Sequence, residues 1–172
     1  PPGGTDNPVI DFRDFAADKS KYFVGRSAVL NEIDQAIASN GGKYVFLKAL
    51  AGMGKSAIMA HLYQTHHPST DEDDTTEQES DSIWLFHFCM HTNGRDQALT
   101  AYRSLIVQLQ MHLGTYSKKR KPSMDIKELK EQFQTLLNGA SESLEKLGKK
   151  RIVVAIDALD ETSFVEEDSI KR

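Results

Sequence analysis

One short stretch of the sequence has the residue types of a phosphate-binding loop. Residues 49–57 read ALAGMGKSA, and they follow the apolar run YVFLK at 44–48. Glycines let such a loop curl so that its backbone N–H groups point inward, and a helix that follows adds the positive end of its dipole. Lys55 can reach the terminal phosphates of a nucleotide, and the hydroxyl of Ser56 can bind Mg²⁺. The pattern therefore predicts a nucleotide site.

The first position of the loop holds alanine where glycine is usual. Ala49 directly follows the expected strand, where a methyl group fits. Taken alone, the stretch also has a simpler interpretation, a tight turn between a strand and a helix with no ligand. In the nucleotide interpretation, the phosphate-binding residues are Ala49, Leu50, Ala51, Gly52, Met53, Gly54, Lys55, Ser56 and Ala57.

A group of carboxylates farther along the chain favours the nucleotide interpretation. The run RIVVAID at 151–157 predicts a buried strand that ends in Asp157, and Asp160 and Glu161 follow within four residues. Open parallel sheets bind their ligands at the carboxyl ends of strands. An aspartate there can hold a Mg²⁺-bound water, and a neighbouring carboxylate can orient or deprotonate the attacking water. We therefore expect Ser56 and Asp157 to serve Mg²⁺.

Strands alternate with helices along the chain. Each strand is apolar throughout, which is typical of a parallel sheet covered on both faces by helices. Apolar spacing and caps place helices at 28–39, 55–66, 99–113 and 126–147, and strands at 44–48, 83–90 and 151–157. Asp125 and Glu128 form a plausible capping pair at the start of the last helix. The expected fold class is α/β.

Composition excludes several classes of protein. The 172 residues suit one domain, and no apolar run approaches the ~20 residues of a membrane span, so we expect no membrane. Cys89 is the only cysteine, which excludes an internal disulfide and favours a cytoplasmic protein. Residues 68–82 hold seven acidic residues and predict a disordered acidic loop. The basic runs at 118–121 and 149–151 lack interleaved aromatic residues, so no nucleic-acid site is expected.

Two other chemistries fit the residues less well. His87, Cys89 and His91 alternate along one expected strand, but neighbours on one strand face stand ~6.6 Å apart and splay in parallel, which suits tetrahedral zinc poorly. A GTPase would need glycine where Asp160 stands, and no NKxD base-recognition motif occurs. The expected base is therefore adenine.

With these motifs in place, residues 22–162 resemble the NACHT family of the STAND class of P-loop ATPases. The resemblance rests on YFVGR (22–26), on ALAGMGKS, on HFCMHTNGRD followed by SLIVQL (104–109), and on IDALDE (156–161). It implies ATP or ADP with Mg²⁺ as cofactors and a three-layer αβα P-loop NTPase fold with a mainly parallel sheet. The residues it places over adenine and ribose are Phe23, Val24, Gly25 and Arg26.

The resemblance also assigns catalytic roles. Lys55 would act on the phosphates, Asp157 would serve Mg²⁺, and Asp160 with Glu161 would position the hydrolytic water. In relatives, a later strand lies between the strand that precedes the loop and the strand that ends in the aspartate. No such strand is expected by Arg172, so we expect the sheet to be incomplete in this chain.

The expected organisation is an N-terminal linker at 1–20, a nucleotide-binding domain at 21–165, and the start of a missing remainder at 166–172. The first functional hypothesis is a nucleotide-dependent signalling switch that drives assembly with other domains or subunits, with slow ATP hydrolysis. The alternatives are a scaffold or interaction protein with a structurally bound nucleotide, and a motor-like AAA+ ATPase with continuous turnover.

Overall fold

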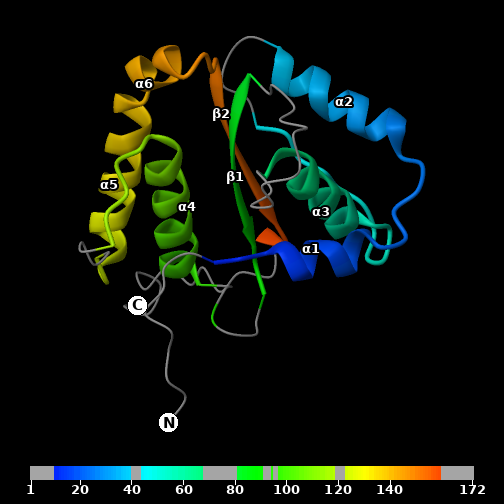
Figure 1. Cartoon of the computed structure of the whole chain (residues 1–172). Coiled ribbons are helices and arrows are strands. Elements are labelled where there is room, and N and C mark those ends of the chain that lie inside the picture. The colour runs from blue at the N-terminus through cyan, green and yellow to red at the C-terminus, as the bar shows by residue number, and fades with distance from the viewer. Residues whose placement is uncertain are drawn as a thin grey trace, which may run out of the picture. The chain divides into compact units, whose positions relative to one another are not determined.

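The computed structural model describes residues 10–39, 44–67, 81–90, 94, 97–118 and 123–159. Figure 1 shows the mixed α/β arrangement of their six helices and two strands. In chain order these are α1 Arg13–Ser20, α2 Ser27–Ala38, α3 Lys55–His66, β1 Ser82–Phe88, α4 Ala98–His112, α5 Ile126–Gly139, α6 Ser141–Lys146 and β2 Arg151–Asp157. They fall into two compact units. Asp11–Ser80 is the loop unit, and Asp81–Arg172 with the first ten residues is the sheet unit.

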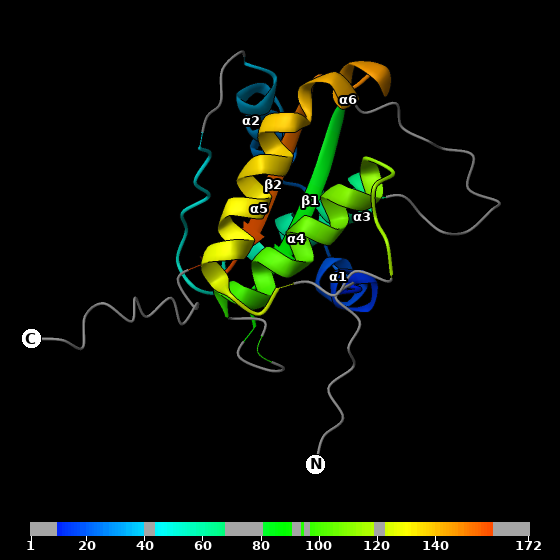
Figure 2. The ribbon, with the colours of Figure 1, turned by 90° about the vertical axis from the view of Figure 1, so that its left-hand side faces the viewer.

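The sheet unit is built on a parallel pair of strands. β1 pairs with β2 from Ser82 opposite Arg151 to Phe88 opposite Asp157. Helix α4 packs on β1 and α5 packs on α4, so the helices form a layer in front of the strands in Figure 2. The core between helix and sheet is made by Ile83, Leu85, Leu105 and Leu109. The parallel sheet predicted from the apolar strands is confirmed for this pair.

The outer edge of β1 is closed by a side chain of α4. The side-chain oxygen of Gln108 accepts a hydrogen bond from the Phe86 N–H at 2.9 Å, and its amide nitrogen donates to the Phe86 carbonyl at 2.8 Å. The same nitrogen donates to the Ser104 hydroxyl at 3.0 Å. The Gln108 amide thus bonds both main-chain groups of Phe86, as the peptide of a neighbouring strand would.

Replacing Gln108 by leucine should destabilise the sheet unit by about 1–3 kcal/mol, because it deprives two buried main-chain groups of these hydrogen bonds while keeping a similar volume. Chemical denaturation monitored by fluorescence of the single tryptophan, Trp84, measures this change. Gln110→Leu on the same helix is the control, because its side chain bonds to no residue in the described part of the chain. Equal stability of the two variants would contradict the role of Gln108.

A cluster of charges joins the beginnings of the two strands. The Lys150 N–H donates to the Asp81 carbonyl at 2.7 Å, and the Asp81 carboxylate lies 3.3 Å from Lys150 Nζ and 3.5 Å from the Arg151 guanidinium. The hydrogen bond from the Ser82 hydroxyl, followed by those two cations, lowers the pKa of Asp81. Part of the basic run at 149–151 therefore holds the strand ends together.

The long helix predicted at 126–147 is broken. It divides into α5 and α6 at Ala140, which is 1% exposed and whose N–H donates to the Leu137 carbonyl three residues earlier. Gly139 precedes the break and weakens the helix, because glycine loses more backbone freedom on folding than any other residue. The predicted cap is confirmed in part: the Asp125 carboxylate accepts from two backbone N–H groups, while the Glu128 carboxylate accepts from the Ser123 hydroxyl.

The strand predicted at 44–48 is wrong. Residues 44–50 form no strand, and the side chains of Tyr44 and Phe46 are 91% and 71% exposed. A strand needs a hydrogen-bonding neighbour, and the described sheet consists of β1 and β2 alone. The strand at 151–157 is confirmed, but its burial on both faces is not, because Val154 and Ile156 are each 37% exposed.

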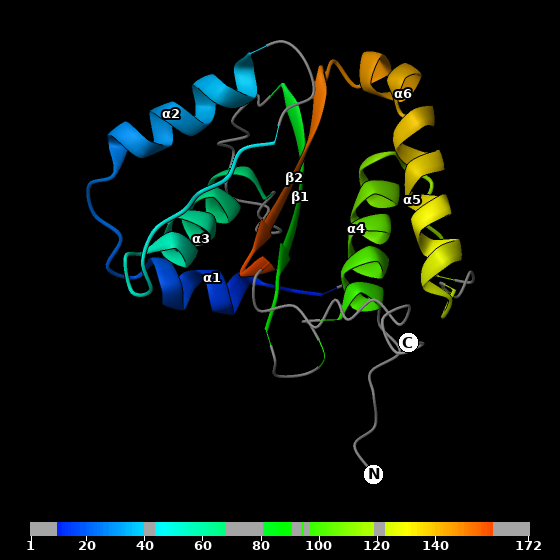
Figure 3. The ribbon, with the colours of Figure 1, turned by 180° about the vertical axis from the view of Figure 1, so that it is seen from behind.

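In the loop unit, α1 packs along α3 (Figure 3). Phe12 meets the edge of Tyr63 with ring centroids 6.2 Å apart, Ala16 is fully buried, and the Ser20 hydroxyl donates to Gln64 at 2.7 Å. Residues 13–20 belong to the segment expected as linker, and here the structure corrects the expectation. The reason is the apolar pair Phe12 and Ala16, four residues apart, which lies on one helical face.

The described helices include none that is long and apolar enough to cross a membrane. The acidic loop expected at 68–82 lies outside the described residues except for Asp81 and Ser82.

Candidate functional site

The glycine-rich loop lies directly before α3 and is open to solvent. Gly52 and Gly54 have φ angles of 78° and 85°, in the left-handed region that residues with a Cβ rarely adopt. Between them, the Met53 N–H donates to the Leu50 carbonyl at 3.3 Å. The loop therefore turns twice before the helix begins, as expected of a phosphate-binding loop.

Lys55 folds back over this loop. Its ammonium donates to the Ala49 carbonyl at 2.9 Å and to the Leu50 carbonyl at 3.3 Å. Two neighbouring carbonyls of the loop therefore hold the positively charged end of the Lys55 side chain. A phosphate that approached the loop would meet this positive charge, and the ammonium could exchange its carbonyl partners for phosphate oxygens.

The N-terminus of α3 has no side-chain cap. Gly54 is the N-cap, and the first helical hydrogen bond runs from the Ile58 N–H to the Gly54 carbonyl. The N–H groups of Lys55, Ser56 and Ala57 precede that bond, so they have no partner within the helix. Amides that lack a partner within the helix, together with the positive end of the helix dipole, favour an anion at this point.

The segment at 22–26 contacts the loop and its helix. The Phe23 ring stacks on the His61 ring of α3, with centroids 4.5 Å apart and planes at 18°. Arg26 donates from its guanidinium to the Met53 carbonyl at 3.1 Å. Gly25 and Arg26 both have positive φ, at 74° and 63°. Val24, which lies between Phe23 and Arg26 in the sequence, is 83% exposed. The structure therefore brings Arg26 to the loop and Phe23 to the helix that follows it.

Burial controls the titratable groups at the far end of α3. It lowers the pKa of His66 and raises the pKa of Tyr63 to about 12. Although a cation is favoured at a helix C-terminus, the desolvation of His66 outweighs that attraction. Both groups are therefore neutral near pH 7.

The expected metal ligands lie in different units. Ser56 stands in the loop unit, and Asp157 ends β2 in the sheet unit, where it is 8% exposed and its carbonyl accepts from the Cys89 N–H at 3.2 Å. Ala158 follows with a left-handed φ of 54°. Asp160 and Glu161 lie outside the described residues. A shared Mg²⁺ site of Ser56 and Asp157 stays a prediction.

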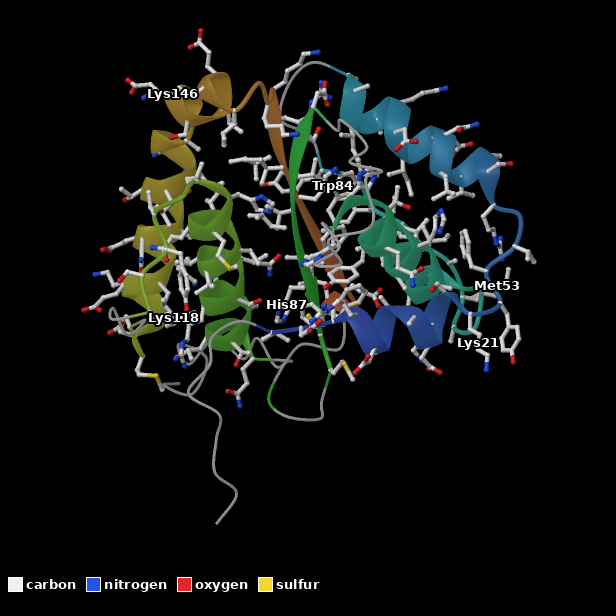
Figure 4. All side chains as sticks on the ribbon, in the orientation of Figure 1. Lys21, Met53, Trp84, His87, Lys118 and Lys146 are labelled. Atoms are coloured by element: carbon white, nitrogen blue, oxygen red, sulfur yellow. The ribbon has the colours of Figure 1, made fainter. Side chains whose placement is uncertain are left out.

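No zinc-like cluster is found where the structure describes the chain. His87 is fully buried on β1, on the opposite face from Trp84 (Figure 4), and no three His, Cys, Asp or Glu side chains gather to hold a metal in the described ranges. His91 lies outside those ranges.

Sequence reasoning missed His61. It lies four residues after Ala57 on the same helix, so helical spacing places it on the face that continues from the loop. That spacing could have indicated a position near the loop. The stacking of Phe23 on His61, which attaches the 22–26 segment to α3, is seen only in the structure.

Comparison with known proteins places the chain in a family. The sequence profile of the family described as nephrocystin 3, N-terminal, matches residues 29–171. The match spans the glycine-rich loop, both strands and Asp157. No curated protein and no solved structure matches the chain.

Proposed function

Given that the chain belongs to the nephrocystin 3 N-terminal family, we propose that its loop unit binds ATP or ADP through a P-loop of the NACHT type. One observation carries the proposal: Lys55 donates to two carbonyls of a loop that has two left-handed glycines and lies at the uncapped start of a helix. The same loop would bind the β- and γ-phosphates through its amides, with Lys55 as the mobile cation. Phe23 to Arg26 would lie beside the base and ribose.

We propose further that Mg²⁺ is held by the Ser56 hydroxyl and, through water, by Asp157. The ion would neutralise phosphate charge when it is bound. A buried carboxylate at the end of a parallel strand fits this role, because Mg²⁺ prefers oxygen ligands. Asp160 and Glu161 would orient the hydrolytic water. The fold proposed around this site is the three-layer αβα P-loop arrangement, with a sheet larger than the described pair.

The proposed role of the nucleotide is a switch. ADP would favour a closed arrangement, and exchange for ATP would permit assembly with other domains or subunits. The acidic set in IDALDE supports a switch over a scaffold, because a purely structural nucleotide needs no water-positioning carboxylates.

Steady-state phosphate release by the protein separates the three candidate roles. A scaffold with a permanent nucleotide releases almost none, a switch releases phosphate slowly in single turnovers, and a motor-like ATPase sustains the release. Sustained turnover would rule out the switch.

Replacing Asp157 by alanine should remove most of the Mg²⁺ dependence of ATP binding while leaving binding without the metal in place. The measurement is ATP affinity by titration calorimetry, with and without Mg²⁺. Glu145→Ala removes an exposed carboxylate from the same unit and is the control. If Asp157→Ala retained the full Mg²⁺ effect, Asp157 would not be a metal residue.

A further inference from the structure

A contact between the 22–26 segment and the loop suggests how one loop amide is oriented. Arg26 donates to the carbonyl of Met53, and Met53 is joined by its peptide bond to Gly54. A trans peptide is planar, and its C=O and N–H point in opposite directions. When the guanidinium holds this carbonyl, the Gly54 N–H must point away from Arg26.

The Gly54 N–H is available to donate a hydrogen bond to a ligand. No residue in the described part of the chain accepts a hydrogen bond from it. It belongs to the last glycine before α3 and adjoins the uncapped amides of that helix. Its left-handed φ of 85° leaves glycine as the favoured residue at this position.

The segment that carries Arg26 is fixed at both of its ends. The Phe23 N–H donates to the Ser20 carbonyl at 2.8 Å, and the Phe23 ring stacks on His61 of α3. At the other end, the Arg26 carbonyl accepts from the Leu30 N–H at 3.0 Å in the first turn of α2. Arg26 itself has a left-handed φ, which is rare for residues with a Cβ and is often found at functional sites.

We propose that Arg26 is a positioning residue for the phosphate-binding loop. Its guanidinium holds the Met53 carbonyl and thereby turns the Gly54 amide toward the bound phosphate. This inference rests on the proposed nucleotide site. It assigns Arg26 an effect on the phosphate end of the nucleotide, exerted through the loop backbone.

The test uses Arg26→Asn in the 172-residue chain, because asparagine tolerates the left-handed backbone but does not carry a guanidinium. Loss of one charged hydrogen bond should weaken ATP and ADP binding about tenfold more than it weakens adenosine binding. Arg26→Lys should restore part of the affinity. Lys21→Asn is the control, because it removes an exposed cation whose ammonium lies 5.4 Å from the centre of the Tyr22 ring; Figure 4 labels Lys21 and Met53.

The Gly54 amide resonance gives a second measurement. In wild type it should shift strongly on addition of Mg·ADP, and Arg26→Asn should reduce that shift. Arg26→Asn should also move the resonance in the nucleotide-free protein, where the Met53 contact is already present. An unchanged unfolding midpoint shows that the variant is folded.

Two results would overturn the inference. Wild-type ATP affinity in Arg26→Asn would show that the contact does not position the loop. Equal losses for ATP and adenosine would show that Arg26 acts on the base or ribose instead. If wild type binds no nucleotide, the proposed function fails, and the Gly54 resonance of the free protein still decides whether Arg26 orients this peptide.

Discussion

Lys55→Ala is expected to abolish tight ATP binding, with a loss of affinity of about 100-fold or more. The Lys55 ammonium donates to the carbonyls of Ala49 and Leu50. Phosphate oxygens are stronger acceptors for it, and each hydrogen bond to a charged group is worth about 1.5–3 kcal/mol. Two such bonds account for the loss, since a factor of ten corresponds to about 1.4 kcal/mol. Calorimetric titration with Mg·ATP measures the change.

The matched control for this variant is Lys48→Ala, which removes an exposed lysine from the segment just before the loop. It alters the net charge equally and should leave ATP affinity almost unchanged. If both variants bound ATP as wild type does, the loop would be a plain turn before a helix, and the proposed function would be lost. If both bound it weakly, only general electrostatic attraction would be at work.

The geometry of the loop could be predicted from the sequence because its determinants are local. Two glycines, a lysine and a helix that starts directly after them fix the turns and the uncapped amides within a few residues. Helices α3 and α4 could also be predicted, because the spacing of apolar residues that indicates a helix is a local feature of the sequence. The orienting contacts could not be predicted, because Arg26 with Met53 and Phe23 with His61 join residues far apart in the chain.

The predictions that proved wrong concern segments whose structure depends on contacts with other parts of the protein. An apolar run such as 44–48 is compatible with a strand, but strand formation depends on an edge that supplies hydrogen bonds. The break at Ala140 depends on packing that buries this small residue, and heptad spacing on both sides conceals it. The placement of α1 depends on Tyr63, far along the chain, which receives Phe12.

The unequal covering of the two strands leads to a further expected result. Leu85 on β1 and Val154 on β2 stand opposite each other in the register, yet Leu85 is fully buried and Val154 is 37% exposed. Leu85→Ala opens a cavity among Ile83, Leu105 and Leu109, and buried leucine truncations cost about 2–5 kcal/mol. Val154→Ala removes fewer contacts at a partly solvated position and should cost less than about 1 kcal/mol.

Urea unfolding monitored through Trp84 fluorescence measures both variants in the sheet unit, because Trp84 is the single tryptophan and is buried on β1. If Leu85→Ala lowers the unfolding midpoint much more than Val154→Ala does, the packing of β1 contributes most of the stability of the unit. Should Val154→Ala prove as costly as Leu85→Ala, the face and edge of β2 must be covered in solution. The exposure of Val154 and Ile156 would then mark a strand position that a further segment occupies.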